Sequence, residues 1–205
     1  MAASGEKSSA ALLPVFLKVA GRRVVVVGGG TVAAAKMGGL AGAGAEVLVV
    51  APVLRQEIVE RVRDTKGWAV AARPFRPDDV DGAWLVVAAA TPEVNRQVAA
   101  AADARRVFVI AVDDPDAASA YGAGVVRRAG VTVAVSTDGV APALTGLVRE
   151  GLEAVLPEEG DLQAWVDTAR DQRAQWRSEG VPMAERRPRL LDAINRLYES
   201  KRVPS

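Results

Sequence analysis

The sequence of 205 residues contains no cysteine and no histidine. The absence of cysteine excludes disulfide bonds, thiolate metal sites and a cysteine nucleophile within it. The absence of histidine removes the commonest metal ligand, the commonest general base and every Ser-His triad. Aromatic residues make up only 4% of the chain, whereas hydrophobic residues make up 50%. The core must therefore be built from alanine, valine and leucine, and a general base must be Asp, Glu, Lys or Tyr.

Charge of either sign is also not in excess, because 26 Lys and Arg face 25 Asp and Glu. Proteins that bind nucleic acid usually carry a basic excess or patch, so we expect no nucleic-acid partner. No run approaches the roughly 18 apolar residues of a membrane span, so we expect no membrane partner. The N-terminal apolar run is short and contains Pro14, unlike a signal peptide. We therefore expect a cytoplasmic protein.

Short apolar runs alternate with helical stretches over the first half of the chain. The expected strands are 23–27, 47–50, 68–72, 84–89 and 107–112, and the expected helices are 31–43, 53–62 and 92–104. Strands that alternate with helices in this way are typical of an α/β protein. The sequence therefore predicts a Rossmann-like, doubly wound parallel sheet.

The pattern changes near residue 114. Two short apolar runs, 120–126 and 131–135, predict a hairpin joined by residues 127–130, and Pro142 suits the start of a helix. Beyond Pro157, apolar residues at helical spacing predict two further amphipathic helices. We expect three parts: a Rossmann domain over 1–113, a hairpin-plus-helix region over 114–157 and a helical C-terminal region over 158–205.

A glycine-rich loop lies between the first predicted strand and helix. It reads Gly28, Gly29, Gly30, Thr31, Val32, Ala33 and fits the pattern G-x-G-x-x-G/A. In such loops the first glycine permits a tight turn, the second lets the backbone approach a pyrophosphate, and the third position packs the helix on the strand. The helix N-terminus then offers N–H groups to the phosphates. The alternative is a strand–helix turn that uses glycine for geometry only.

The second predicted strand lacks the acid that usually binds the ribose of NAD. It ends in Val50, Ala51 and Pro52, and Arg55 follows. Arg55 could favour the 2′-phosphate of NADP, or it could be a solvated arginine at the start of a helix. From these residues alone, the choice between NAD and NADP stays open.

Polar residues follow two other predicted elements. Thr91 and Asn95 flank the end of the fourth strand and are candidates for the adenosine or nicotinamide pocket, although Thr91 also suits the N-cap of the helix that begins at Pro92. Ser136 and Thr137 precede a helix and could contact a substrate carboxylate or form a turn.

Several motifs resemble the dehydrogenase part of siroheme synthase, the precorrin-2 dehydrogenase and sirohydrochlorin ferrochelatase family. The resemblance covers residues 12 to about 157. It rests on a Pro-hydrophobic-hydrophobic lead, Lys36 in the helix after the glycines, and Ala51-Pro52 at the end of the second strand. Further matching motifs lie at 89–95, 112–115, 134–137, 142–144 and 149–153.

The resemblance implies an enzyme that oxidises precorrin-2 to sirohydrochlorin with NAD, and some members of this family also insert ferrous iron. It places the catalytic carboxylate on Asp113, which could instead begin a turn before Pro115. It implies cofactor contacts at Ala51 and Pro52, no resident metal, and a homodimer formed through the 114–157 region.

Precorrin-2 is a polycarboxylate, so its pocket should supply cations or helix N-termini. Arg149, Arg127 and Arg128 are candidates by position, besides Ser136 and Thr137. The residues around them depart from the family pattern, whereas the dinucleotide half matches more closely. Two other functions are a non-catalytic dinucleotide sensor and an oxidoreductase that acts on another substrate. A sensor should tolerate Asp113→Ala, whereas the enzyme should not.

Overall fold

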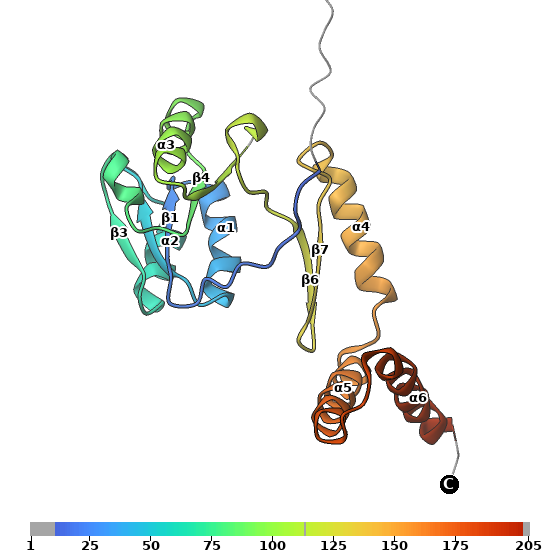
Figure 1. Ribbon diagram of the computed structural model, residues 1–205. Helices are drawn as coiled ribbons and strands as arrows, with labels where there is room; N and C mark the ends of the chain where they lie inside the picture. The colour runs from blue at the N-terminus through green and yellow to red at the C-terminus, as the bar shows by residue number, and fades with distance from the viewer. Residues whose placement is uncertain (1–10, 113, 203–205) are drawn as a thin grey trace, which may run out of the picture. The chain divides into compact units, whose positions relative to one another are not determined.

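A computed structural model describes residues 11–112 and 114–202 of the chain. The chain divides into two compact units, the first ending at Gly122 and the second starting at Ala123. Figure 1 shows the helices and strands of each unit.

The first unit contains a parallel sheet of five strands in the order β3-β2-β1-β4-β5. The strands are β1 (Arg23–Val27), β2 (Glu46–Val50), β3 (Ala69–Ala71), β4 (Leu85–Ala88) and β5 (Phe108–Ala111). The connecting elements are α1 (Thr31–Gly42), α2 (Gln56–Asp64), the 3₁₀ turn η1 (Pro77–Val80) and α3 (Pro92–Ala104), and the turn η2 (Pro115–Ala117) follows β5. This order reverses between β1 and β4, which confirms the predicted doubly wound fold.

Strand β1 lies at the centre of the sheet because its valines are apolar on both faces. Val24 and Val26 belong to the apolar cluster beneath α1 and α2, which includes Met37 and Ile58. Val25 and Val27 face the cluster on the other side of the sheet, with buried residues of α3 such as Val98. A strand covered by helices on both faces reads as a continuous apolar run, as the sequence predicted.

Helix α2 begins at Gln56, later than the sequence predicted. The preceding segment is held in an extended conformation, because the N–H of Arg55 donates to the Gly29 carbonyl at 3.0 Å. Residues 53–55 follow a helical sequence pattern, but this hydrogen bond to a loop far away in the sequence keeps Arg55 out of the helix.

The second unit contains a hairpin and three helices. The strands are β6 (Gly124–Arg128) and β7 (Val131–Val135), and the helices are α4 (Pro142–Val155), α5 (Glu159–Glu179) and α6 (Met183–Arg202). None of the helices in the described part of the chain is both long and apolar enough to cross a membrane.

The hairpin differs from the prediction at both ends. Its turn consists of Ala129 and Gly130, which both have positive φ, as a two-residue turn of type I′ requires. The first strand starts at Gly124 and not at Ala120. Ala120 still belongs to the first unit, where its N–H donates to the carbonyl of Val109 on β5. The predicted start at Ala120 and the predicted connection over 127–130 were therefore wrong.

Asp79 ties together the segment between β3 and β4. Its buried carboxylate accepts two hydrogen bonds from the Arg73 guanidinium, at 2.6 and 2.9 Å, and one from the Arg76 N–H at 2.8 Å. The hydrogen bonds from Arg73, together with that from the Arg76 backbone, lower the pKa of the Asp79 carboxyl from its ordinary value. Hydrogen bonds to a charged group each contribute more to stability than neutral ones.

We expect Asp79→Asn to lower the free energy of unfolding by about 1–3 kcal/mol at pH 7, measured by urea denaturation. A carboxyl with a lowered folded pKa stabilises above its unfolded pKa of about 4, and this stabilisation disappears as the pH falls through the folded pKa. The difference between native protein and variant should therefore shrink below pH 4. Asp64→Asn is the control, because Asp64 is exposed and bonds to its neighbour Arg63. Equal stability of native protein and Asp79→Asn would contradict this role.

Candidate dinucleotide-binding site

Three loops meet at the carboxyl ends of β1, β2 and β4. The N–H of Gly28 donates to the Val50 carbonyl at the end of β2, at 3.0 Å. The N–H of Ala89 donates to the Val27 carbonyl at the end of β1, at 2.8 Å. Ligands of open α/β sheets bind at this edge, where the strand order reverses.

Gly28 and Gly29 have no room for a side chain. A Cβ at Gly28 would lie 2.2 Å from the Ala89 carbonyl oxygen, and its φ of +133° also disfavours other residues. A Cβ at Gly29 would lie 1.9 Å from the Val53 carbonyl oxygen. These two glycines are therefore required by the packing of the protein's own backbone.

Gly30 differs from its neighbours because it faces open space. Apart from Gly30 itself and its two neighbours in the chain, no heavy atom among the described residues lies within 4 Å of the position that its Cβ would take. Gly30 is the N-cap of α1, and the first turn of this helix carries no acidic residue. Thr31 and Val32 are exposed, whereas Ala33 is fully buried against the sheet.

A dinucleotide fits this arrangement. The open space in front of Gly30 admits a diphosphate to the backbone, and the N-terminus of α1 supplies unpaired N–H groups and the positive end of the helix dipole. The absence of an acid in the first turn of α1 leaves no negative charge on that helix end to repel it.

An ion pair that the sequence did not lead us to expect follows the end of β2, where dinucleotide-binding proteins usually carry a ribose-binding acid. Ala51 is buried, and Pro52 and Val53 are exposed at the end of β2. Arg55 follows, and its Nε donates to the Glu57 Oε1 at 2.9 Å, with both side chains about half exposed. Arg55 is therefore not a solitary solvated cation. The sequence signal was the Arg-x-Glu spacing at the start of a helix.

Thr91 and Asn95 lie at the start of α3, next to the ends of β4 and β5. Thr91 caps α3, because its Oγ1 accepts the Val94 N–H at 3.5 Å. Asn95 is buried, with 3% of its surface exposed, and its carboxamide bonds to the backbone of Ala90 and Val112. Its carboxamide is thus engaged within the protein.

The predicted catalytic residue, Asp113, lies outside the described residues. Its neighbour Asp114 caps the turn η2, since its Oδ1 accepts the Ala117 N–H at 3.2 Å. A turn before Pro115 was the alternative role expected for the aspartates at this position. Asp114 forms such a turn.

The polar residues predicted for the substrate lie in the second unit and are largely bonded to it. Thr137 Oγ1 bonds to the Thr145 hydroxyl at 2.9 Å and accepts the Ala141 N–H at 3.2 Å, and Ser136 Oγ accepts the Asp138 N–H at 3.1 Å.

Of the three candidate arginines, Arg127 is exposed on β6, and the other two have partners. Arg149 pairs with Glu153 at 2.7 Å and more loosely with Glu150 on its own helix. Arg128 donates to the carbonyls of Leu156 and Pro157, both at 2.9 Å, so it caps the C-terminus of α4.

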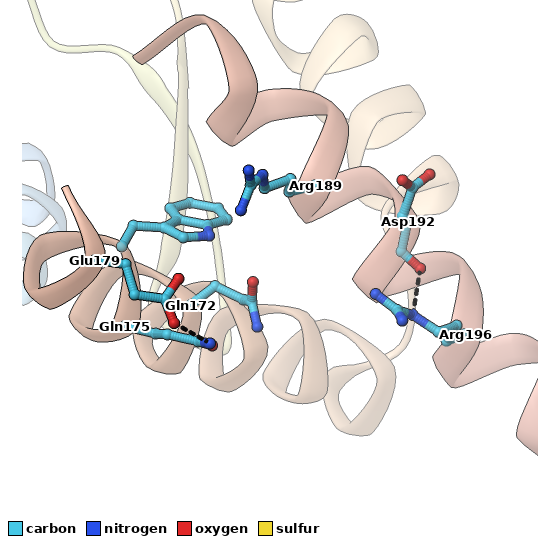
Figure 2. Close-up of a pocket in the computed structure, with 7 residues that line it drawn as sticks. Gln172, Gln175, Glu179, Arg189, Asp192 and Arg196 are labelled. Carbon is cyan, nitrogen blue, oxygen red and sulfur yellow. Dashed lines mark hydrogen bonds between the residues drawn. The ribbon is translucent and has the colours of Figure 1, made fainter. Parts of the chain in front are cut away.

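A hollow of about 240 Å³ lies between α5 and α6, and Figure 2 shows its lining. Trp176 lies at this hollow, and its other walls are polar, with the acids Glu179 and Asp192 matched by two arginines. The polar groups bond along their own helices, as when Gln175 Nε2 donates to Glu179 at 2.8 Å. Within the described residues, no group of three or more Asp and Glu side chains lies close enough together to hold a metal ion.

Comparison with protein families settles what the first unit is. Residues 15–123 match the model of a family described as "Putative NAD(P)-binding". The match covers more than half of the chain. The chain belongs to this NAD(P)-binding family. Its glycine loop lies within the matched residues, which supports the use of this loop for a dinucleotide.

The resemblance suggested by the motifs is confirmed by similar proteins. The chain is 39% identical to siroheme synthase 3 of Aeromonas hydrophila over 188 residues, which are 88% of this chain and 39% of that protein. It is 39% identical to the siroheme synthase of Nitrosospira multiformis over 164 residues, which are 78% of this chain and 35% of that protein. The chain thus spans less than half the length of these relatives.

A solved structure titled "SirC, precorrin-2 dehydrogenase" has a similar fold. Its TM-score is 0.67 and its sequence identity 23%, with 88% of each chain covered. This likeness confirms the predicted combination of a Rossmann-like sheet, a small hairpin and C-terminal helices.

The contrast between Gly29 and Gly30 leads to a prediction. Gly30→Ala should fold with nearly native thermal stability, since its φ of −93° and the open space tolerate a Cβ. It should bind NAD⁺ at least tenfold more weakly in calorimetric titration, because the methyl group occupies the path of the diphosphate. Gly29→Ala should instead lose several degrees of melting temperature. Native affinity in Gly30→Ala would contradict this site.

The Arg55–Glu57 pair leads to a second prediction, about cofactor choice. Glu57→Gln should raise the affinity for NADP⁺ relative to NAD⁺ about two- to fivefold, the range expected for an exposed ion pair. The change removes a negative charge near the expected position of the ribose and frees Arg55 from this ion pair for a 2′-phosphate. Glu60→Gln, one turn further along α2, is the control. An unchanged ratio of the two affinities would show that this pair does not face the ribose.

Proposed function

We propose that this protein oxidises precorrin-2 to sirohydrochlorin, with NAD⁺ as the hydride acceptor. The observation that carries the proposal is the 39% identity to a siroheme synthase over 88% of the chain. The open glycine position at the edge of the sheet supports it, because it offers the diphosphate of the cofactor a place.

In the proposed reaction, precorrin-2 and NAD⁺ give sirohydrochlorin, NADH and a proton. The cofactor, when bound, takes the hydride. The N-terminus of α1 from Gly30 to Val32 holds the diphosphate, Ala51 and Pro52 border the adenosine ribose, and Thr91 borders the nicotinamide side.

Asp113 is the proposed base that accepts the proton, because the family resemblance places the catalytic carboxylate there, and a carboxylate is one of the bases open to a sequence without histidine or cysteine. The support for this role of Asp113 is the resemblance of residues 112–115 to the precorrin-2 dehydrogenase family. A ferrous ion, if the protein inserts one, is a substrate of a second reaction and not a resident cofactor.

The region over 114–157 is proposed to bind the substrate carboxylates and to form a homodimer. Ser136, Thr137 and Arg149 lie before or within α4 and are proposed to face the carboxylates. All residues of α4 are described and none is buried, and Leu144, Leu147 and Val148 are exposed on it. A second copy of the chain would cover this apolar face. We place this reaction in the cytoplasm, as the sequence led us to expect.

An anaerobic assay with enzymatically prepared precorrin-2 and NAD⁺ tests the function. We expect NADH and sirohydrochlorin to form together, and Asp113→Asn to turn over at least about 100-fold more slowly while it still binds NAD⁺. Asp103→Asn, an exposed residue near the end of α3, is the control and should keep native activity.

The other outcomes point to other functions. Full turnover by Asp113→Asn would move the base to another residue. No NADH from native protein that binds NAD⁺ would contradict the proposed reaction and favour a dinucleotide sensor or another substrate. A repeat with ferrous ion, compared with a protein-free control, decides whether metal insertion is a second activity.

A further inference from the structure

We propose that Asn95 is a positioning residue that holds the ends of β4 and β5 together and thereby sets the rate of turnover. This inference rests on the function proposed above. It changes the role expected from the sequence, in which Asn95 was a cofactor ligand.

The backbone and the burial of Asn95 fix the position of its side chain. Its backbone N–H donates to the Thr91 carbonyl at 2.8 Å in the first turn of α3. Only 3% of the residue is exposed, and Val98 on the same helix is fully buried. The carboxamide therefore points into the protein, toward the strand ends.

The carboxamide bridges two loops. Its Oδ1 accepts the Ala90 N–H at 2.9 Å, just after β4, and its Nδ2 donates to the Val112 carbonyl at 3.5 Å, just after β5. The N–H of Val112 in turn donates to the Ala88 carbonyl at 2.9 Å. Val112 is thus bonded on both its N–H and its C=O, and Asn95 supplies the second bond.

Asparagine suits this place because one partner is a donor and the other an acceptor. An ionised Asp could accept the Ala90 N–H but could not donate to the Val112 carbonyl. An Ala would remove the bonds of the carboxamide to the Ala90 N–H and the Val112 carbonyl. The bridge thus uses both ends of the carboxamide.

The position of this bridge gives it a consequence for catalysis. Ala90 precedes Thr91 at the proposed cofactor side, and Val112 precedes Asp113, the proposed base, in the sequence. Displacement of a reacting group by about 1 Å can cost about 100-fold in rate. Loosening the end of β5 should therefore reduce kcat while the glycine loop continues to bind the cofactor.

The test uses Asn95→Asp, which preserves size and the bond to Ala90 but removes the bond to Val112. We expect kcat at pH 8 to fall about 10- to 100-fold, with the NAD⁺ dissociation constant within threefold of native. A protonated Asp has one donor and one acceptor, as Asn does. The kcat of Asn95→Asp relative to native should therefore recover only as the pH falls toward the ordinary Asp pKa of about 4.

The chain offers a matched control in Asn195, its other asparagine, which is exposed on α6. Asn195→Asp should have native kcat and a native pH profile. Hydrogen exchange gives a readout without turnover: the Val112 amide should exchange at least tenfold faster in Asn95→Asp, and both it and the Ala90 amide should do so in Asn95→Ala.

The results separate the two proposals. A native kcat and native exchange in Asn95→Asp would overturn the positioning role. A fall in NAD⁺ affinity equal to the fall in kcat would also overturn it and make Asn95 a cofactor ligand. If the native protein does not oxidise precorrin-2, the proposed function fails, and slow exchange at Val112 in Asn95→Asp would then overturn the bridge itself.

Discussion

The structure depends on the close approach of three backbone segments at the glycine loop. The carbonyl oxygens of Ala89 and Val53 lie where side chains would stand on Gly28 and Gly29. These contacts bring the ends of β1, β2 and β4 together at one edge of the sheet. They also direct Gly30 and the N-terminus of α1 outward, so that the same constraint that closes the sheet edge opens the proposed cofactor site.

The sheet could be predicted because each of its strands is specified by residues that are neighbours in the sequence. A run of valines between charged residues and glycines predicts a buried strand, and alternation with helices predicts a doubly wound sheet. The start of α3 follows from Pro92 and the Thr91 cap in the same way. The late start of α2 could not be predicted, because it depends on the bond between Arg55 and Gly29, two residues on different loops.

The roles of polar side chains were harder to predict than the strands. Arg128 caps α4, and Asn95 bridges two strand ends, although each was considered for ligand binding from its position in the sequence. A sequence shows that a side chain can form hydrogen bonds. Which group becomes its hydrogen-bond partner depends on the tertiary structure. The pairing of Arg55 with Glu57 is an intermediate case, since their spacing at the start of a helix was visible.

The central claim is that a dinucleotide binds at the edge formed by the glycine loop and the ends of β2 and β4. Titration of ¹⁵N-labelled protein with NAD⁺, followed by the shifts of backbone amide signals, tests it most directly. We expect the largest shifts at the non-proline residues of 28–34, 51–55 and 89–92, and small shifts along α5 and α6. Shifts concentrated at the polar hollow between α5 and α6, with the glycine-loop signals unchanged, would contradict it.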